Sequence, residues 1–166
     1  MLRSQDILLV LKIQASGRDS FAALGQSIGI SASQAYAATK RAIVAELLRD
    51  DLSVRQKALF DTLLAAKYYM PAKRGGLVRG IPTAYAAKPL SDLIQSNDEP
   101  VPVWPHPEGI ERGLSCEPIY KTACQAALND PKLYEYLALV DALRIGRARE
   151  ITMAKTELEL RLLESA

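Results

Sequence analysis

Apolar residues recur every three or four positions along most of this chain, a spacing that favours helices with one buried side. The first such stretch covers residues 4–15, where Ser4 is placed to cap the helix and Gly17 to end it. Its buried positions would be Ile7, Leu8, Leu11 and Ala15. We therefore predict that the chain opens with an amphipathic helix.

Two further helices are predicted close behind the first, with a tight turn between them. One ends at about Ile28, and the other begins at Ser31 and runs through Leu48. Gly29 suits the turn because glycine tolerates positive φ, and Gly25 is small enough to let the two helices cross closely. Residues 3–52 thus have the pattern of a helix-turn-helix unit.

The remaining chain alternates between helical and irregular patterns. Residues 52–54 fit a short strand, and residues 55–68 fit a fourth helix that Pro71 closes. Residues 70–118 hold eight of the nine prolines, so helices are improbable there except over residues 90–95. Extended segments are predicted at 77–85, 102–104 and 113–119, and C-terminal helices at 121–128, 131–145 and 147–164. The expected fold class is mostly α, with short strands in the middle.

The turn and its flanks carry a family pattern. The stretch LGQSIGISASQAYAATKRA, residues 24–42, resembles the helix-turn-helix of winged-helix regulators of the MarR type, the multiple-antibiotic-resistance regulators. The quoted stretch covers 19 of the 166 residues. It implies an N-terminal winged helix-turn-helix whose third helix enters the major groove of double-stranded DNA.

The resemblance also implies which residues face the DNA. The exposed set on the third helix would be Ser31, Ser33, Gln34, Tyr36, Ala37, Lys40 and Arg41. The serines suit phosphates, and Gln34 suits adenine. Two departures stand out: Glu46 occupies the place of a usual glycine, and only residues 49–53 are left for a wing. Wing contacts are therefore expected to be absent or to come from elsewhere.

A basic stretch in the middle of the chain is the first alternative source of phosphate contacts. Residues 62–91 carry five basic side chains and no acidic one, whereas residues 92–118 carry six acidic side chains and one basic. Lys73, Arg74 and Arg79 lie among glycines, which let a chain approach phosphates closely. The segment either contacts DNA as a displaced wing, binds an acidic partner protein, or docks onto the acidic stretch of the same chain.

Composition narrows the remaining possibilities. With 49% hydrophobic and 24% charged residues, the chain can bury a core. Cys116 and Cys124 do not form a disulfide framework, and together with His106 they make no recognisable zinc pattern. No signal peptide or membrane span is evident, which predicts a cytoplasmic protein. We expect no cofactor and no metal, and no catalytic constellation is visible.

These observations predict a sequence-specific DNA-binding transcriptional regulator, a dimeric repressor. Residues 1–68 would form the DNA-binding domain, residues 69–120 an irregular middle region, and residues 121–166 a helical region that makes a homodimer. The alternative is an antitoxin-like protein that binds a partner encoded nearby and regulates its own operon. An enzyme with an appended helix-turn-helix is a third reading.

Overall fold

The computed structural model of the chain describes residues 1–95 and 98–164. Its helices are α1 (Ser4–Ser16), α2 (Phe21–Ile28), α3 (Ala32–Val44), α4 (Gln56–Leu64), α5 (Ala66–Tyr69), α6 (Ala123–Leu128), α7 (Pro131–Ile145) and α8 (Ala148–Glu159). A π-helical turn, η3 (Leu160–Glu164), extends α8, and η1 (Ala84–Ala86) and η2 (Leu90–Asp92) are 3-10 turns. The strands are β1 (Arg74–Pro82), β2 (Pro102–Pro105) and β3 (Glu111–Cys116). The prediction of a mostly helical chain with strands in the middle and C-terminal helices is confirmed.

The first three helices form a compact unit whose turns match the sequence prediction. Gly29 ends α2 with a φ of 78°, and the Ser31 hydroxyl caps α3 by accepting a hydrogen bond from the Gln34 amide at 3.0 Å. A Cβ added at Gly25 would lie 2.6 Å from the carbonyl oxygen of Ile30. Only glycine lets α2 and α3 cross this closely.

The chain beyond α3 departs from the prediction. The helix ends at Val44 instead of Leu48, because Glu46 adopts a φ of 62° and Leu47 turns into the core. The predicted strand at residues 52–54 is a single bridge from Leu48 to Val54. The predicted helix at 55–68 is divided into α4 and α5 by a break at Ala65.

The middle region forms a small closed barrel. Strand β1 pairs antiparallel with both β2 and β3, and β2 pairs with β3 in parallel. A Cβ at Gly80 would lie 2.1 Å from the carbonyl oxygen of Trp104, and one at Gly113 would lie 2.1 Å from that of Val101. Because glycine has no Cβ, the neighbouring backbones can approach closely at these two positions, and the three strands can close into a narrow barrel. Residues 90–95, predicted as a possible helix, contain only the turn η2.

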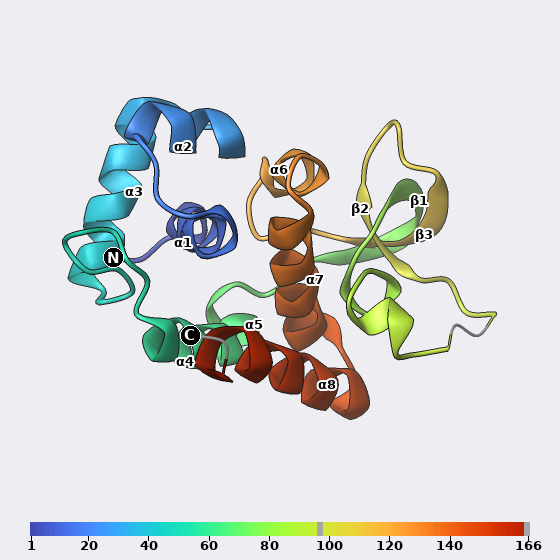
Figure 1. Cartoon of the computed structure of the whole chain (residues 1–166). Coiled ribbons are helices and arrows are strands. Elements are labelled where there is room, and N and C mark those ends of the chain that lie inside the picture. The colour runs from blue at the N-terminus through green and yellow to red at the C-terminus, as the bar shows by residue number, and fades with distance from the viewer. Residues whose placement is uncertain (96–97, 165–166) are drawn as a thin grey trace.

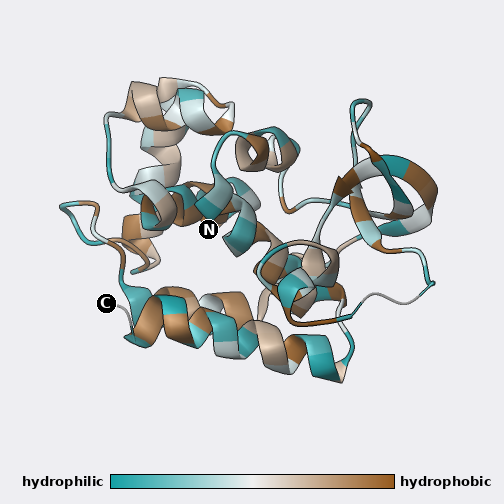
Figure 2. Cartoon of the chain, turned by 45° about the vertical axis from the view of Figure 1, so that its right-hand side comes forward, coloured by the Kyte–Doolittle hydropathy of each residue, from teal (hydrophilic) through white to brown (hydrophobic). Residues whose placement is uncertain are grey.

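Helix α7 runs through the centre of the molecule, between α1 and the η1 segment next to the barrel (Figure 1). All of its residues from Tyr136 to Arg144 are buried. Helix α8 packs along α7 through Ala154 and Leu158, and polar and apolar residues alternate along it (Figure 2). Helix α7 thus contributes most of its residues to the core of one chain.

A buried polar network attaches the barrel to α7. The Asp141 carboxylate accepts hydrogen bonds at 2.7 Å from Thr83, from the Trp104 indole and from Arg144. Arg144 also donates to the carbonyl oxygen of Met70 at 2.7 Å. One continuous hydrophobic core contains residues of all three predicted segments, including Leu8, Leu63, Trp104 and Leu137.

Candidate nucleic-acid interface

Helix α3 presents one side to the core and a chemically mixed side to solvent. Ala35, Ala38 and Ala42 are buried against the other helices. The exposed residues are Ser31, Ser33, Gln34, Tyr36 and Lys40, as predicted, while Ala37 is half-buried. The ring of Tyr36, 49% exposed, packs edge-on against Phe21 at 5.2 Å, and the Lys40 ammonium lies 5.3 Å from the centre of the Tyr36 ring. The outward side of α3 thus combines a fixed aromatic ring with a cation and a hydroxyl group.

The side chain of Gln34 is partly engaged within the helix. Its amide oxygen accepts a hydrogen bond from the Ser31 backbone at 2.9 Å, which completes a capping box. Bidentate recognition of adenine uses both the oxygen and the nitrogen of a glutamine amide. In this conformation only the amide nitrogen of Gln34 is available to a base.

Arg41 is not the exposed, free side chain that the sequence suggested. Its guanidinium donates to both carboxylate oxygens of Asp6, at 2.8 and 2.9 Å, and to the amide oxygen of Gln5 at 3.2 Å. The side chain is 20% exposed and that of Asp6 is fully buried. The hydrogen bond that Arg41 donates to Asp6 raises the pKa of Arg41. Arg41 ties α3 to α1, so its substitution would disturb the fold together with any DNA contact.

A short hairpin stands where a wing would follow α3. The Arg55 amide donates to the carbonyl oxygen of Leu47 at 2.8 Å and closes it. Its tip carries Asp50 and Asp51, and hydrogen bonds from Ser53 lower the pKa of Asp51. Arg49 lies next to these aspartates in the sequence, and the Arg18 guanidinium is 3.8 Å from the Asp51 carboxylate, so the tip has no large net negative charge. A single bridge between Leu48 and Val54 joins the two sides of this hairpin, which is as short as the sequence predicted.

An open groove of about 790 Å³, which the sequence analysis did not predict, lies beside α3. One wall is α3, the floor is the first turn of α1, and the other wall is the segment 117–121 that follows β3. A hydrogen bond of 3.1 Å from the Gln5 amide to the Tyr120 hydroxyl holds the floor against that wall. The groove is lined by Arg3, Ser4, Gln5, Gln34, Ala37, Arg41, Glu117, Pro118, Ile119, Tyr120 and Lys121. It depends on contacts among three segments that are distant in sequence.

The basic stretch of the middle region lies mostly away from α3. Lys73, Arg74 and Arg79 are exposed, and β1 lies on the far side of α6 and α7 from α3 (Figure 1). Only the start of β1 approaches the groove, since the carbonyl oxygen of Lys73 accepts from the Glu117 amide at 3.0 Å. The structure does not bring Arg79 together with the exposed residues of α3.

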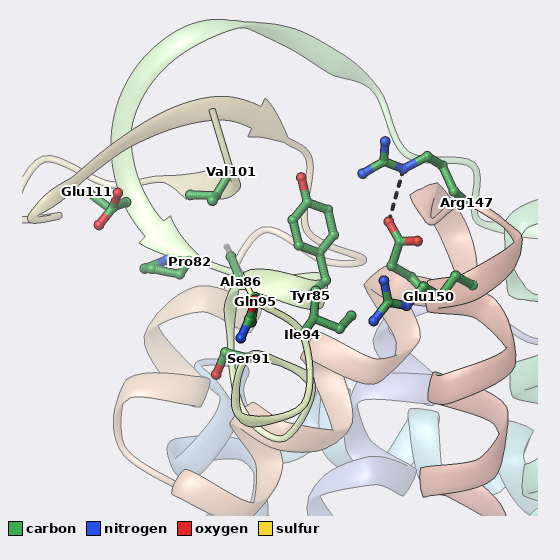
Figure 3. A pocket seen from close by; sticks show the side chains of 11 residues that line it. Pro82, Tyr85, Ala86, Ser91, Ile94, Gln95, Val101, Glu111, Arg147 and Glu150 are labelled. Carbon is green, nitrogen blue, oxygen red and sulfur yellow. Dashed lines mark hydrogen bonds and ion pairs between the residues drawn. The ribbon is translucent and has the colours of Figure 1, made fainter. Parts of the chain in front are cut away.

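A second pocket, of about 580 Å³, lies between the barrel and the start of α8 (Figure 3). The ring of Tyr85 stands near its middle, and the Arg147 guanidinium donates to the Glu150 carboxylate at 3.3 Å at its edge. Burial raises the pKa of Tyr85. The charged groups at this edge largely neutralise each other, so the pocket does not form a basic surface.

The cysteines and the histidine do not form a reactive site. Burial raises the pKa of Cys116 to about 12 and that of Cys124 to about 11, so both stay protonated thiols near neutral pH. His106 lies in a loop, where its Nδ1 accepts from the Glu108 amide at 3.1 Å. Within residues 1–95 and 98–164, no three His, Cys, Asp or Glu side chains are grouped to hold a metal ion.

Among the described residues, no helix is both long enough and apolar enough to cross a bilayer.

The exposed side of α3 and the groove beside it are the main candidate site. Comparisons of the chain with protein-family models, with curated proteins and with solved structures find no match.

Proposed function

We propose that this protein is a sequence-specific double-stranded DNA-binding transcriptional regulator, with α3 as its recognition helix. The observation that carries the proposal is the solvent-facing side of α3. It presents Ser33, Tyr36 and Lys40 on the second helix of a closely packed helix-turn-helix pair. Such a helix can enter a major groove, where tyrosine contacts thymine methyl groups and lysine contacts bases or phosphates. The resemblance of residues 24–42 to MarR-type regulators supports the same reading.

We further propose that the regulator acts as a homodimer and represses transcription. One recognition helix reads only a half-site, and symmetry doubles the contact. Because most of α7 is buried within one chain, we place the dimer contact mainly on the exposed side of α8. The complex with a selected duplex is then expected to contain two chains.

Selection from a random duplex pool tests this proposal. We expect the protein to enrich a defined sequence. The double variant Tyr36→Ala with Lys40→Gln should lose about tenfold or more in affinity for that duplex, because base and phosphate contacts are removed together. Fluorescence anisotropy over a range of salt concentrations measures both the affinity and its salt dependence.

Lys155→Gln is the matched control for the lost charge. Lys155 is exposed on α8, and this helix lies at the opposite end of the molecule from α2 (Figure 1). Its substitution should leave the affinity for DNA unchanged. Failure of the unaltered protein to enrich any sequence or to bind any duplex would overturn the proposed function.

One surface favours a second candidate function, the binding of an acidic partner protein. Arg79 and Arg112 are directly opposite each other on β1 and β3, an arrangement in which like charges destabilise a sheet. Neither side chain forms an ion pair with a described residue. Beside them, Ile110 is 97% exposed and Leu77 is 50% exposed. A phosphate backbone offers nothing to such apolar side chains, whereas an acidic amphipathic protein segment matches both properties.

Co-expression with the product of the adjacent gene tests this second function. We expect a stoichiometric complex in size-exclusion chromatography that is lost in the variant Arg79→Glu with Arg112→Glu, because the charges that attract the partner are reversed. Lys155→Glu is the control and should leave the complex intact. If the unaltered protein elutes without the product of the adjacent gene, this second function is contradicted.

A further inference from the structure

The groove beside α3 has features that suit one strand of a DNA backbone. We propose that the groove between α3 and the segment 117–121 binds the phosphodiester strand that borders the major groove occupied by α3, with Arg3 and Lys121 as the phosphate contacts. The inference rests on the proposed function. It assigns phosphate contacts to a segment after the barrel, in addition to any that the short hairpin of residues 47–55 makes.

The position of the groove follows from how a helix sits in DNA. A helix in the major groove has a phosphate strand along each flank, because the groove is only about 12 Å wide. One flank of α3 carries Gln34, Ala37 and Arg41, which form a wall of the groove. A strand on that flank therefore runs toward the opposite wall, formed by residues 117–121. The groove is open to solvent and not enclosed, which fits a polymer better than a small molecule.

The cations around the groove are not equivalent. Arg41 belongs to the α3 wall, but its charge is neutralised by the buried carboxylate of Asp6. Arg3 and Lys121 are both exposed, and neither forms an ion pair with a described residue. The Lys121 ammonium lies 6.0 Å from the centre of the Tyr120 ring. The hydroxyl group of Tyr120 in turn accepts a hydrogen bond from the Gln5 side chain. These two side chains are the charges that the groove can offer to phosphates.

One carboxylate in the groove allows a substitution that should strengthen DNA binding, whereas loss of either cation should weaken it. Glu117 is exposed and lines the same groove, and its side chain makes no ion pair within the described residues. Its backbone already bonds to Lys73 and Arg144, so the side chain can be changed without removing those bonds. A negative charge here repels a phosphate strand, and its removal should tighten binding.

The experiment compares variants on two duplexes, the selected sequence and a random one. Arg3→Gln and Lys121→Gln should each weaken binding to both duplexes by the same factor and lower the salt slope by about one. Glu117→Gln should strengthen binding to both. The ratio of the two affinities should change only in Tyr36→Ala, since phosphate contacts carry no sequence information.

Three outcomes separate the two proposals. Unchanged salt slopes in Arg3→Gln and Lys121→Gln, with normal binding by the unaltered protein, would overturn the groove assignment and leave the recognition helix standing. Weaker binding in Glu117→Gln would also overturn it. Absence of duplex binding by the unaltered protein would overturn the proposed function itself. Lys155→Gln is again the charge control, and thermal unfolding curves confirm that each variant is folded.

Discussion

Replacing Asp141 by alanine is expected to destabilise the protein by about 3–5 kcal/mol. The substitution removes the acceptor that Thr83 and Trp104 share and leaves the Arg144 guanidinium buried without its carboxylate. An uncompensated buried charge costs more than the loss of the ion pair alone, because the interior cannot solvate it. Urea unfolding followed by circular dichroism measures the change in the free energy of unfolding.

Two further substitutions make the Asp141 result specific. Asp61→Ala removes a carboxylate from an exposed ion pair with Lys57, 2.9 Å long, and should cost about 1 kcal/mol or less. Asp141→Asn keeps the shape of the side chain and one acceptor oxygen. Its loss in the free energy of unfolding should therefore be smaller than that of Asp141→Ala and larger than that of Asp61→Ala. A loss in Asp141→Ala no larger than that in Asp61→Ala would show that the buried network does not stabilise the fold.

Replacing Gly25 by alanine is expected to destabilise the protein by about 1–3 kcal/mol, the usual cost of overpacking a tight contact. The new Cβ would lie 2.6 Å from the carbonyl oxygen of Ile30 and 2.9 Å from that of Ser31. Both are backbone atoms, which cannot rotate away as a flexible side chain can. The loss should appear even though alanine is the better helix former. Urea unfolding again gives the magnitude.

Gly76→Ala is the matched control for Gly25→Ala. A Cβ at Gly76 has no other atom within 4 Å, and Gly76 does not have a positive φ. Its substitution should therefore be close to neutral. Equal stabilities of the two variants would mean that α2 and α3 have room to separate, and that the close crossing at Gly25 is not required.

The helical parts of the fold could be predicted because their signals are local. Ser31, Gly29 and Pro131 mark helix ends through hydrogen bonds and backbone angles that involve only near neighbours. The end of α3 was placed wrongly because Glu46 adopts the positive φ that a glycine normally marks. The helical pattern continues through Leu47 and Leu48, but these side chains are buried by the hairpin that follows.

The barrel and the groove could not be predicted for a different reason. Their defining contacts join Gly80 to Trp104, Gly113 to Val101 and Gln5 to Tyr120, pairs that are far apart in the sequence. Exposure was predictable for Ser33 and Lys40 from helical spacing. It was not predictable for Arg41, whose environment is set by Asp6 on another helix. Charge patterning alone gives no information on which cations are already paired.

The burial of α1 has a consequence for how this chain can be cut and recombined. Its residues from Ile7 to Leu11 are fully buried, because α3 packs on one side of the helix and α7 on another. A fragment ending near residue 68 would expose to water the side of α1 that α7 covers. The N-terminal helices are therefore not a transplantable module, and a domain swap at that boundary would need to carry α7 with it.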